Sequence, residues 1–441
     1  MHVLENMLGL LVLIGVMILV HEFGHFWVAR RFDVRIDVFS FGFGPRLGGF
    51  KRGETDFRVS LIPFGGYVKM AGEQAGEENA DDPRAFMSKP RWQRLAIAFA
   101  GPAMNVVLAV GMLTGLFMVK FPKAPPSEVQ GMVGYITPDS PAAKAGIREG
   151  DRIIAIDDVQ NPTWDDIATR EVSGANRPMG VRIRRGGREF PTTVTPVLDP
   201  HRGVGSAGWE VEAELQLAAI TTGMPADKAG LQKGDVLLSA DGQPLRSIER
   251  LHEVISASGG KPVSLELLRA GKELNVAIRP VFAQDPPKSP ARWMIGVLPQ
   301  PLTIMTQLPF PEALRESVRQ NLKNATMIYQ FLKGIAEQRM SAKSIEGPIG
   351  IARLSGDAAR EGAVAFLALM AVVSLNLAIF NLLPIPILDG GVILLLLVEM
   401  LMRRDLSVRV KEAVFKLGFV FLMAVMAFVI YNDISKMILP G

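Results

Sequence analysis

The chain has 441 residues, no cysteine and a formal charge of only +4. Its length suggests about three folding units, and a hydrophobic content of 49% indicates membrane spans combined with soluble modules. The small net charge gives no reason to expect nucleic acid as a partner. The absence of cysteine excludes disulfides, thiolate zinc sites and cysteine nucleophiles.

Residues 1–30 predict the first membrane span. Leu8–Val20 is almost unbroken hydrocarbon. Neither a basic start nor a small-residue cleavage site accompanies it, so we interpret it as an uncleaved anchor and not as a signal peptide. The span ends at Arg30 and Arg31, which indicates a cytoplasmic end and an N-terminus outside.

Three polar residues lie inside this first span. His21 and His25 are four residues apart, so on a helix they share a face and can hold one metal ion. Glu22 is placed to take a proton from a metal-bound water. The alternative is a pair of histidines satisfied by neighbouring groups, but burying them in lipid is costly and such residues are functional by default. We therefore predict a metal site within the membrane.

Residues 31–92 do not have a helical pattern. Apolar residues alternate with charged or aromatic ones over 34–40 and again over 57–62, with glycine and proline nearby, which is typical of short strands or hairpins. A strand edge near 57–70, beside the metal site, could hold an extended substrate by backbone pairing. The pattern also fits a plain cytoplasmic loop. We expect residues 72–91 to be a mobile linker.

A second span is predicted over residues 93–120. It contains Gly101 and Pro102, which a membrane helix tolerates when neighbouring helices cover the freed backbone groups. Asn105 follows them, and we expect it to bond to a neighbouring helix, so we assign it to packing first.

Residues 121–203 and 204–284 form an internal repeat. Pro141, Gly187 and Pro196 recur at a constant offset of 84 residues, which indicates two copies of one domain. In both copies the string Pro-Ala-x-x-Ala-Gly precedes Gly-Asp, and this pattern resembles the PDZ domains of bacterial proteases. Such domains bind extended peptides or chain ends, although here they could also be spacers or shields.

The last third of the chain predicts two more spans. Residues 285–361 are interpreted as a periplasmic linker with an amphipathic helix near 311–339 and a turn at 346–351. The apolar stretch 362–402 is too long for one crossing of a core about 30 Å thick. It should therefore hold a third span, an unwound segment and a return that does not cross. Residues 403–441 start with basic residues and predict the fourth span.

The unwound segment carries polar groups that could complete the metal site. Pro384 and Pro386 prevent it from closing into a helix, and Asp389 needs a cationic partner inside hydrocarbon. Catalytic zinc takes three protein ligands and one water. The two histidines supply two, so Asp389 is the best candidate for the third. Asn381 could hold the substrate backbone or stabilise an oxyanion.

Together these motifs resemble the site-2 protease family of intramembrane zinc metalloproteases. The resemblance rests on His21-Glu22-Phe23-Gly24-His25, on Asn381-x-x-Pro384-x-Pro386-x-x-Asp389-Gly390, and on the strings at 65–70 and 346–349 around the repeat. It implies a multi-pass α-helical membrane protein with four transmembrane helices, a membrane-associated β-rich loop and two inserted α/β PDZ domains.

The resemblance also implies a role for each site residue. Zn²⁺ would be held by His21, His25 and Asp389, Glu22 would be the general base, and substrate would be bound by Asn381, Pro384, Pro386, Gly65 and Gly66. The enzyme would lie in the bacterial inner membrane with its PDZ domains in the periplasm. Its substrate would be a single-span anti-sigma factor of the envelope stress response, already trimmed outside, or a remnant signal peptide. The PDZ domains would control access, with or without peptide ligands of their own.

Two other function classes fit part of this pattern. A membrane-anchored PDZ receptor or chaperone without catalysis would not need Glu22, because holding a metal requires no base. A zinc transporter would also place histidine and aspartate in the membrane, but it would usually show repeated broken spans. Here the two motif halves differ from each other.

Overall fold

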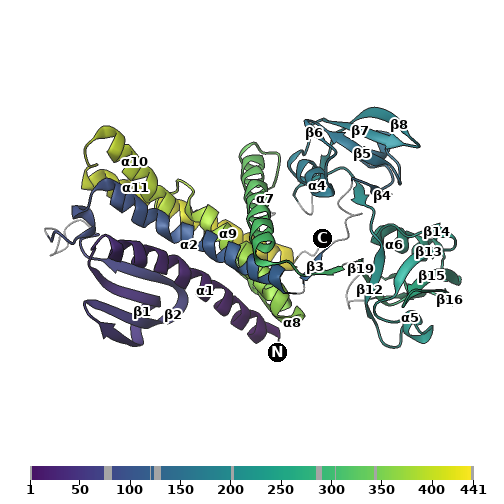
Figure 1. The fold of residues 1–441 in the computed structure, drawn as a ribbon, viewed down its shortest axis with the longest axis horizontal. Helices are drawn as coiled ribbons and strands as arrows, with labels where there is room; N and C mark the ends of the chain where they lie inside the picture. The colour runs from purple at the N-terminus through teal and green to yellow at the C-terminus, as the bar shows by residue number, and fades with distance from the viewer. Residues whose placement is uncertain are drawn as a thin grey trace. The chain divides into compact units, whose positions relative to one another are not determined.

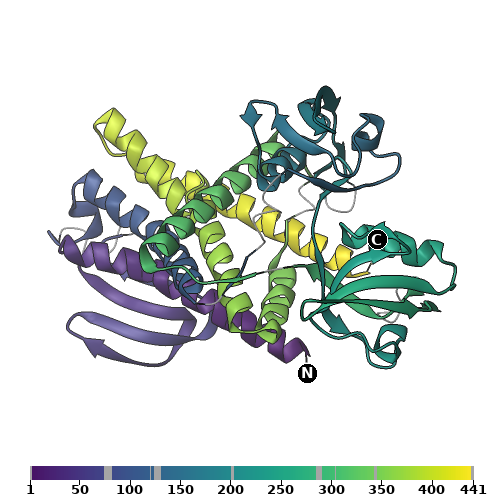
Figure 2. The same cartoon turned by 45° about the vertical axis from the view of Figure 1, so that its right-hand side comes forward.

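The structure is a computed structural model that describes residues 2–73, 82–119, 121–123, 131–199, 203–284, 291–302, 304–341 and 345–438. The chain divides into two compact units. The first joins Met1–Phe121, Gln307–Tyr329 and Ile345–Gly441, and the second joins Pro122–Thr306 and Gln330–Ser344. In Figures 1 and 2 the first unit consists of long helices with one curved hairpin, and the second contains two lobes of strands and short helices.

The helices of the first unit include the predicted spans. Among the described residues, four helices are long and apolar enough to cross a membrane, over Leu4–Arg31, Arg91–Met118, Ala363–Asn381 and Val408–Lys436. This number agrees with the four spans predicted from the sequence. α10 has 14 residues and would extend about 21 Å, which is too short to cross. The elements of this unit are α1 (His2–Arg31), β1 (Ile36–Arg52), β2 (Thr55–Met70), a 3-10 helix (Phe86–Ser88), α2 (Arg91–Met118), α8 (Pro348–Glu361), α9 (Ala363–Asn381), α10 (Asp389–Met402) and α11 (Val408–Ile438). Two elements, α7 (Phe310–Ala336) and β3 (Phe121–Lys123), have residues in both units, and β20 (Ile304–Thr306) belongs to the second.

Glycines bring α1 and α2 together at the level of the two histidines. A Cβ on Gly24 would lie 2.3 Å from the Ala100 carbonyl oxygen, and a Cβ on Gly101 would lie 2.3 Å from Nε2 of His25. Helices in lipid associate largely through such close backbone approach, because burying apolar surface gains nothing there. The glycines therefore let α2 approach the metal-binding face of α1.

β1 and β2 form a curved sheet beside α1 (Figure 1). The strand pattern predicted over 34–40 and 57–62 is confirmed, but the strands are longer and continue through the glycines and prolines. Across the sheet, residues 46–52 of β1 pair with 55–60 of β2. On their other side, residues 56–59 pair with 38–41 of β1, and 36–41 in turn pair with 66–70 of β2. The segment 56–59 is thus interior, and the free edges are 46–52 and 66–70. Of the substrate edge expected near 57–70, the part that is a free edge is 66–70.

Residues 82–90 are packed, which corrects the prediction of a mobile linker for this part of 72–91. Phe86 is buried in a cluster with β1, β2 and both neighbouring helices. Arg84 forms an ion pair of 2.8 Å with Glu54, and its backbone carbonyl accepts from the Arg35 amide. The other part of that prediction, 74–81, lies outside the described residues.

A helix that the sequence analysis missed begins inside the segment predicted as a turn at 346–351, so the turn prediction is wrong for 348–351. α8 begins at Pro348, and the buried carboxylate of Asp433 on α11 accepts from the amides of Gly347, Ile349 and Gly350 at 2.9–3.1 Å. The first amides of a helix have no partner within it. An acceptor supplied by another helix therefore both caps α8 and attaches it to α11.

The second unit contains two copies of one arrangement. Helix α4 (Trp164–Ser173) in the first copy matches α6 (Ile248–Ala257) in the second at the offset of 84. Each copy has its own buried core of aliphatic residues. The first copy contains β4 (Val133–Ile136), α3 (Pro141–Lys144), β5 (Arg152–Ile156), β6 (Val159–Gln160), α4, β7 (Met179–Arg185), β8 (Arg188–Val194), β9 (Val197–Leu198), β10 (Gly205–Ser206) and β11 (Trp209–Val211). The second copy contains β12 (Leu215–Ile220), α5 (Pro225–Lys228), β13 (Val236–Ala240), β14 (Gln243–Pro244), α6, β15 (Val263–Arg269), β16 (Lys272–Ile278), β17 (Val281–Ala283), β18 (Arg292–Met294) and β19 (Val297–Pro301).

The repeated Gly-Asp has the same structural role in both copies. Asp151 binds Arg185 at 2.6 Å, and Asp235 binds Arg269 at 2.7 Å. Burial would raise the pKa of Asp235, but hydrogen bonds from Arg269 and from the Gln232 amide lower it below its usual value. In the first copy the aspartate therefore connects the turn before β5 to strand β7, and in the second it connects the turn before β13 to strand β15.

Each copy ends later than the repeat alone predicts. β11 pairs with β4, and β19 pairs with β12, so the boundaries at 203 and 284 cut each copy before its last strand. The amide of Thr137 donates to the Gly208 carbonyl, and the amide of Thr221 donates to the Gly296 carbonyl in the same way. The two donors are 84 residues apart and the two acceptors 88, so the second copy contains a four-residue insertion between them. A fixed offset cannot follow the chain beyond such an insertion.

Candidate metal centre

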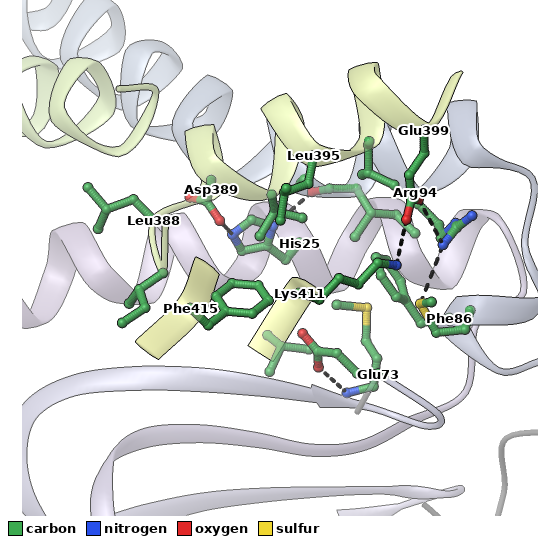
Figure 3. A pocket seen from close by; sticks show the side chains of 18 of the residues that line it. His25, Glu73, Phe86, Arg94, Leu388, Asp389, Leu395, Glu399, Lys411 and Phe415 are labelled. Carbon is green, nitrogen blue, oxygen red and sulfur yellow. Dashed lines mark hydrogen bonds and ion pairs between the residues drawn. The ribbon is translucent and has the colours of Figure 1, made fainter. Parts of the chain in front are cut away.

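Two segments far apart in the chain bring three potential metal ligands together. His21 and His25 lie on one face of α1, and Asp389 is the first residue of α10. The carboxylate thus lies at a helix N-terminus, where the helix dipole favours negative charge. Figure 3 shows Asp389 directed at His25 from the opposite side of the cavity.

The separations between the ligand atoms fit a tetrahedral metal. Nε2 of His21 lies 3.1 Å from Oδ2 of Asp389, Nε2 of His25 lies 3.4 Å from Oδ1 of Asp389, and the two Nε2 atoms are 3.3 Å apart. Zinc–ligand bonds of about 2.0–2.1 Å in a tetrahedron place ligand atoms roughly 3.3 Å apart. The three groups therefore match one face of a zinc site.

Each histidine also has a polar partner on α2. Nδ1 of His25 lies 2.8 Å from the Ile97 carbonyl oxygen, and Nδ1 of His21 lies 3.3 Å from the side-chain amide of Asn105. A metal-binding histidine usually donates its other ring N–H to such a partner, which sets its tautomer and orientation. The predicted bond between Asn105 and a neighbouring helix is thus present.

Glu22 faces the same cavity as the three ligands. Val68 lines this cavity beside it, and a Cβ on Gly66 would lie 3.3 Å from Cγ of Glu22 and 2.9 Å from the Ser40 carbonyl oxygen. The edge 66–70 of the sheet therefore packs directly against the candidate base. Close packing is the structural role of Gly66, and substrate contact there stays a prediction.

The remaining residues predicted to bind substrate differ in position. Nδ2 of Asn381, at the end of α9, is 3.5 Å from Nε2 of His21, so this amide reaches the centre. Pro384 and Pro386 do not line the cavity with it, and Pro386 packs against Gly418 of α11. A Cβ on Gly65 would lie 2.0 Å from the Phe43 ring, which gives this glycine a packing role.

The turn before Asp389 contains an unusual backbone conformation. Ile387 has a φ of 88°, which a β-branched residue rarely adopts. Strain of this kind persists where the surrounding structure imposes it. Here the turn allows α10 to begin at Asp389, opposite the histidines.

The cavity has a volume of about 860 Å³ and extends from the histidines to a buried charged cluster. Glu399 of α10 is fully buried and forms an ion pair of 2.6 Å with Lys411 of α11. Arg94 of α2 lies 3.9 Å from Glu399 and 3.2 Å from Asp405. A hydrogen bond from Arg91 holds the pKa of Asp405 below its usual value. The cluster joins α2, α10 and α11 at this end (Figure 3).

The sequence analysis missed the role of Asn105 beside His21 and the whole charged cluster. A signal existed for both, because Asn105 and Glu399 are single polar residues within apolar runs and such residues need partners. Their partners come from other helices, and the sequence does not identify them.

Comparison with known proteins adds an independent observation. A sequence profile of peptidase family M50 matches residues 9–425. The regulator of sigma-E protease RseP of Salmonella typhimurium is 33% identical over 99% of this chain and 100% of its own length, and that of Escherichia coli is 32% identical over 98% and 99%. A Vibrio cholerae protein that carries the name of a zinc metalloprotease is 30% identical over 99% of both chains.

Proposed function

We propose that this chain, which belongs to peptidase family M50, cuts the membrane-spanning segment of a single-span protein. Its family and relatives identify it as a site-2-type metalloprotease. The observation that carries the proposal is the set of ligand-atom separations among His21, His25 and Asp389, which fits Zn²⁺. We infer that these three residues are the zinc ligands.

The chemistry follows from the positions of the side chains. Zinc, when bound, supplies a Lewis acid that lowers the pKa of water to about 7 and polarises a carbonyl group. Glu22 then accepts the proton of the attacking water and passes it to the leaving nitrogen. The amide of Asn381, close to His21, donates to the substrate backbone or to the developing oxyanion.

The edge strand at 66–70 is proposed to hold the substrate. A protease can reach a carbonyl only along an extended backbone, and an extended backbone in lipid needs hydrogen-bond partners. Tyr67, Val68 and Met70 line the cavity, so a substrate strand paired with this edge would pass beside Glu22. The free edge at 46–52 does not line the cavity.

Gly66→Ala tests this edge. The added methyl would press on Ser40, Ile18 and Glu22, and a displacement of about 1 Å at a reacting group can cost around 100-fold in rate. We expect cleavage to fall by at least about tenfold while zinc content stays normal. Gly48→Ala is the control, because no atom of the described residues lies within 4 Å of its Cβ. Equal activities of the two variants would contradict the proposed edge.

The substrate class follows from the names of the relatives. Because two of them are named as regulators of sigma-E, we propose an anti-sigma factor of the envelope stress response, trimmed outside, as substrate. Remnant signal peptides are a second source of such segments. We place the enzyme in the inner membrane, since basic residues at 30–31 and 403–404 mark the cytoplasmic side and leave the repeat in the periplasm.

The two repeats are proposed to be PDZ domains that control access. In the first, Glu171 of α4 accepts from the Ala207 amide at 2.6 Å and from Nε1 of Trp209 at 2.8 Å, which bridges α4 to β11. In the second, a cavity of about 70 Å³ lies between α6 and the segment 292–297. We propose that the second repeat receives a peptide end at this cavity and that the first acts as a shield.

A reconstituted cleavage assay tests the whole proposal. The chain is placed in liposomes with a single-span substrate, either intact or lacking its folded outer domain. We expect cleavage within the span of the trimmed substrate only, and a zinc chelator should stop it. If both forms are cut at equal rates, the proposed access control is wrong. If neither is cut by the zinc-loaded chain, the proposed substrate class is wrong.

A further inference from the structure

Asn105 is a polar side chain beside the metal centre that the proposed reaction does not use. It is fully buried on α2, and Ser374 of α9 donates to its backbone carbonyl at 2.9 Å. This bond holds the residue in place from a third helix. Its side-chain amide faces Nδ1 of His21 at 3.3 Å, on the side of the ring away from Asp389.

The tautomer of His21 decides whether it can bind a metal. Nε2 is the ring atom near His25 and Asp389, so it must offer a lone pair, and the ring proton must then be on Nδ1. His25 satisfies the same requirement through the Ile97 carbonyl oxygen, which can only accept from Nδ1. His21 needs an acceptor of its own, and among the described residues the Asn105 amide is the group beside its Nδ1.

An amide can present either its oxygen or its nitrogen, and the two cannot be told apart by shape. With Nδ2 facing His21, the amide would donate to Nδ1 and place the ring proton on Nε2, where it blocks a metal. That orientation also leaves Oδ1 buried without a hydrogen-bond partner in the part of the chain that the structure describes. If the amide is rotated by half a turn, Oδ1 accepts from the Nδ1–H of His21. The NH₂ group then occupies the former position of Oδ1.

We propose that Asn105 is the positioning residue of His21, whose Nδ1–H it accepts through its side-chain oxygen so that Nε2 stays free for the metal. This inference rests on the proposed function, because it concerns the same zinc site. The acceptor oxygen and not the volume of the side chain is the essential feature. A carboxylate can replace it, whereas an apolar residue of similar size cannot.

The test compares zinc affinities of Asn105→Leu and Asn105→Asp in the full chain, by competition with a chromophoric chelator. Loss of an outer-shell partner typically weakens metal binding by about 10- to 100-fold, and we expect this for the leucine variant. The aspartate variant should stay within about threefold of the wild type, since carboxylates serve as the same kind of partner. Thr114→Ala removes another buried polar group of α2, a hydroxyl that donates to the Val110 carbonyl within the same helix, and this control should bind zinc normally.

Thermal unfolding of the metal-free chains separates positioning from packing. The proposal expects the metal-free leucine and aspartate variants to unfold at similar temperatures while their zinc affinities differ. Wild-type zinc affinity in the leucine variant, or an equal loss in both variants, would overturn it. If the leucine variant does not fold, Asn105→Ala replaces it with the same expected loss. Failure of the wild-type chain to bind zinc would instead refute the proposed function.

Discussion

Glu22→Gln is expected to retain one zinc per chain and to lose peptide cleavage. Glutamine keeps the size of the side chain and can still contact the edge strand, but it cannot accept the proton of the attacking water. General-base catalysis typically contributes about 100- to 10,000-fold in rate, so the residual rate should fall by that factor. The measurement is cleavage of the trimmed single-span substrate, with metal content determined on the same preparation.

This variant also separates the three function classes that the sequence leaves open. A PDZ receptor or a zinc transporter should keep its activity in Glu22→Gln, because neither uses a general base. Glu412→Gln is the control, since this carboxylate lines the far part of the same cavity and has no proposed role. Full cleavage by the Glu22 variant would contradict the assignment of the base.

Asp389→Ala is expected to lose both zinc and activity. It removes the one ligand that α10 supplies, and it leaves the two histidines of α1 without the carboxylate 3.1–3.4 Å from their Nε2 atoms. Loss of an outer-shell partner already costs up to about 100-fold in affinity, so loss of a direct ligand should cost more. Zinc competition on the purified chain measures the effect.

Asp405→Ala is the matched comparison for this second variant. Asp405 also lines the cavity but binds Arg91 and Arg94 and no histidine. It should keep wild-type zinc affinity, although the charged end of the cavity loses an ion pair. Normal zinc content in Asp389→Ala would remove this residue from the metal site.

The amino-acid sequence by itself determined the local features of this protein. The spacing of His21 and His25 on an apolar helix, the four candidate spans and the two-copy repeat all follow from periodicity within short segments. So does the unwound segment before Asp389, because proline and glycine limit the backbone wherever they occur. Each of these features depends on neighbours within a few residues or on a simple recurrence.

Only the tertiary structure decided which distant groups meet. Alternation predicts a strand but carries no information about its partners, so the segment 56–59 could not be recognised as interior or 66–70 as the edge beside Glu22. In the same way Asn105 reaches His21, and Glu399 reaches Lys411, because glycines and capped helix ends set how the helices pack. Such contacts arise from the shapes of whole helices pressed together, and no short stretch of sequence records them.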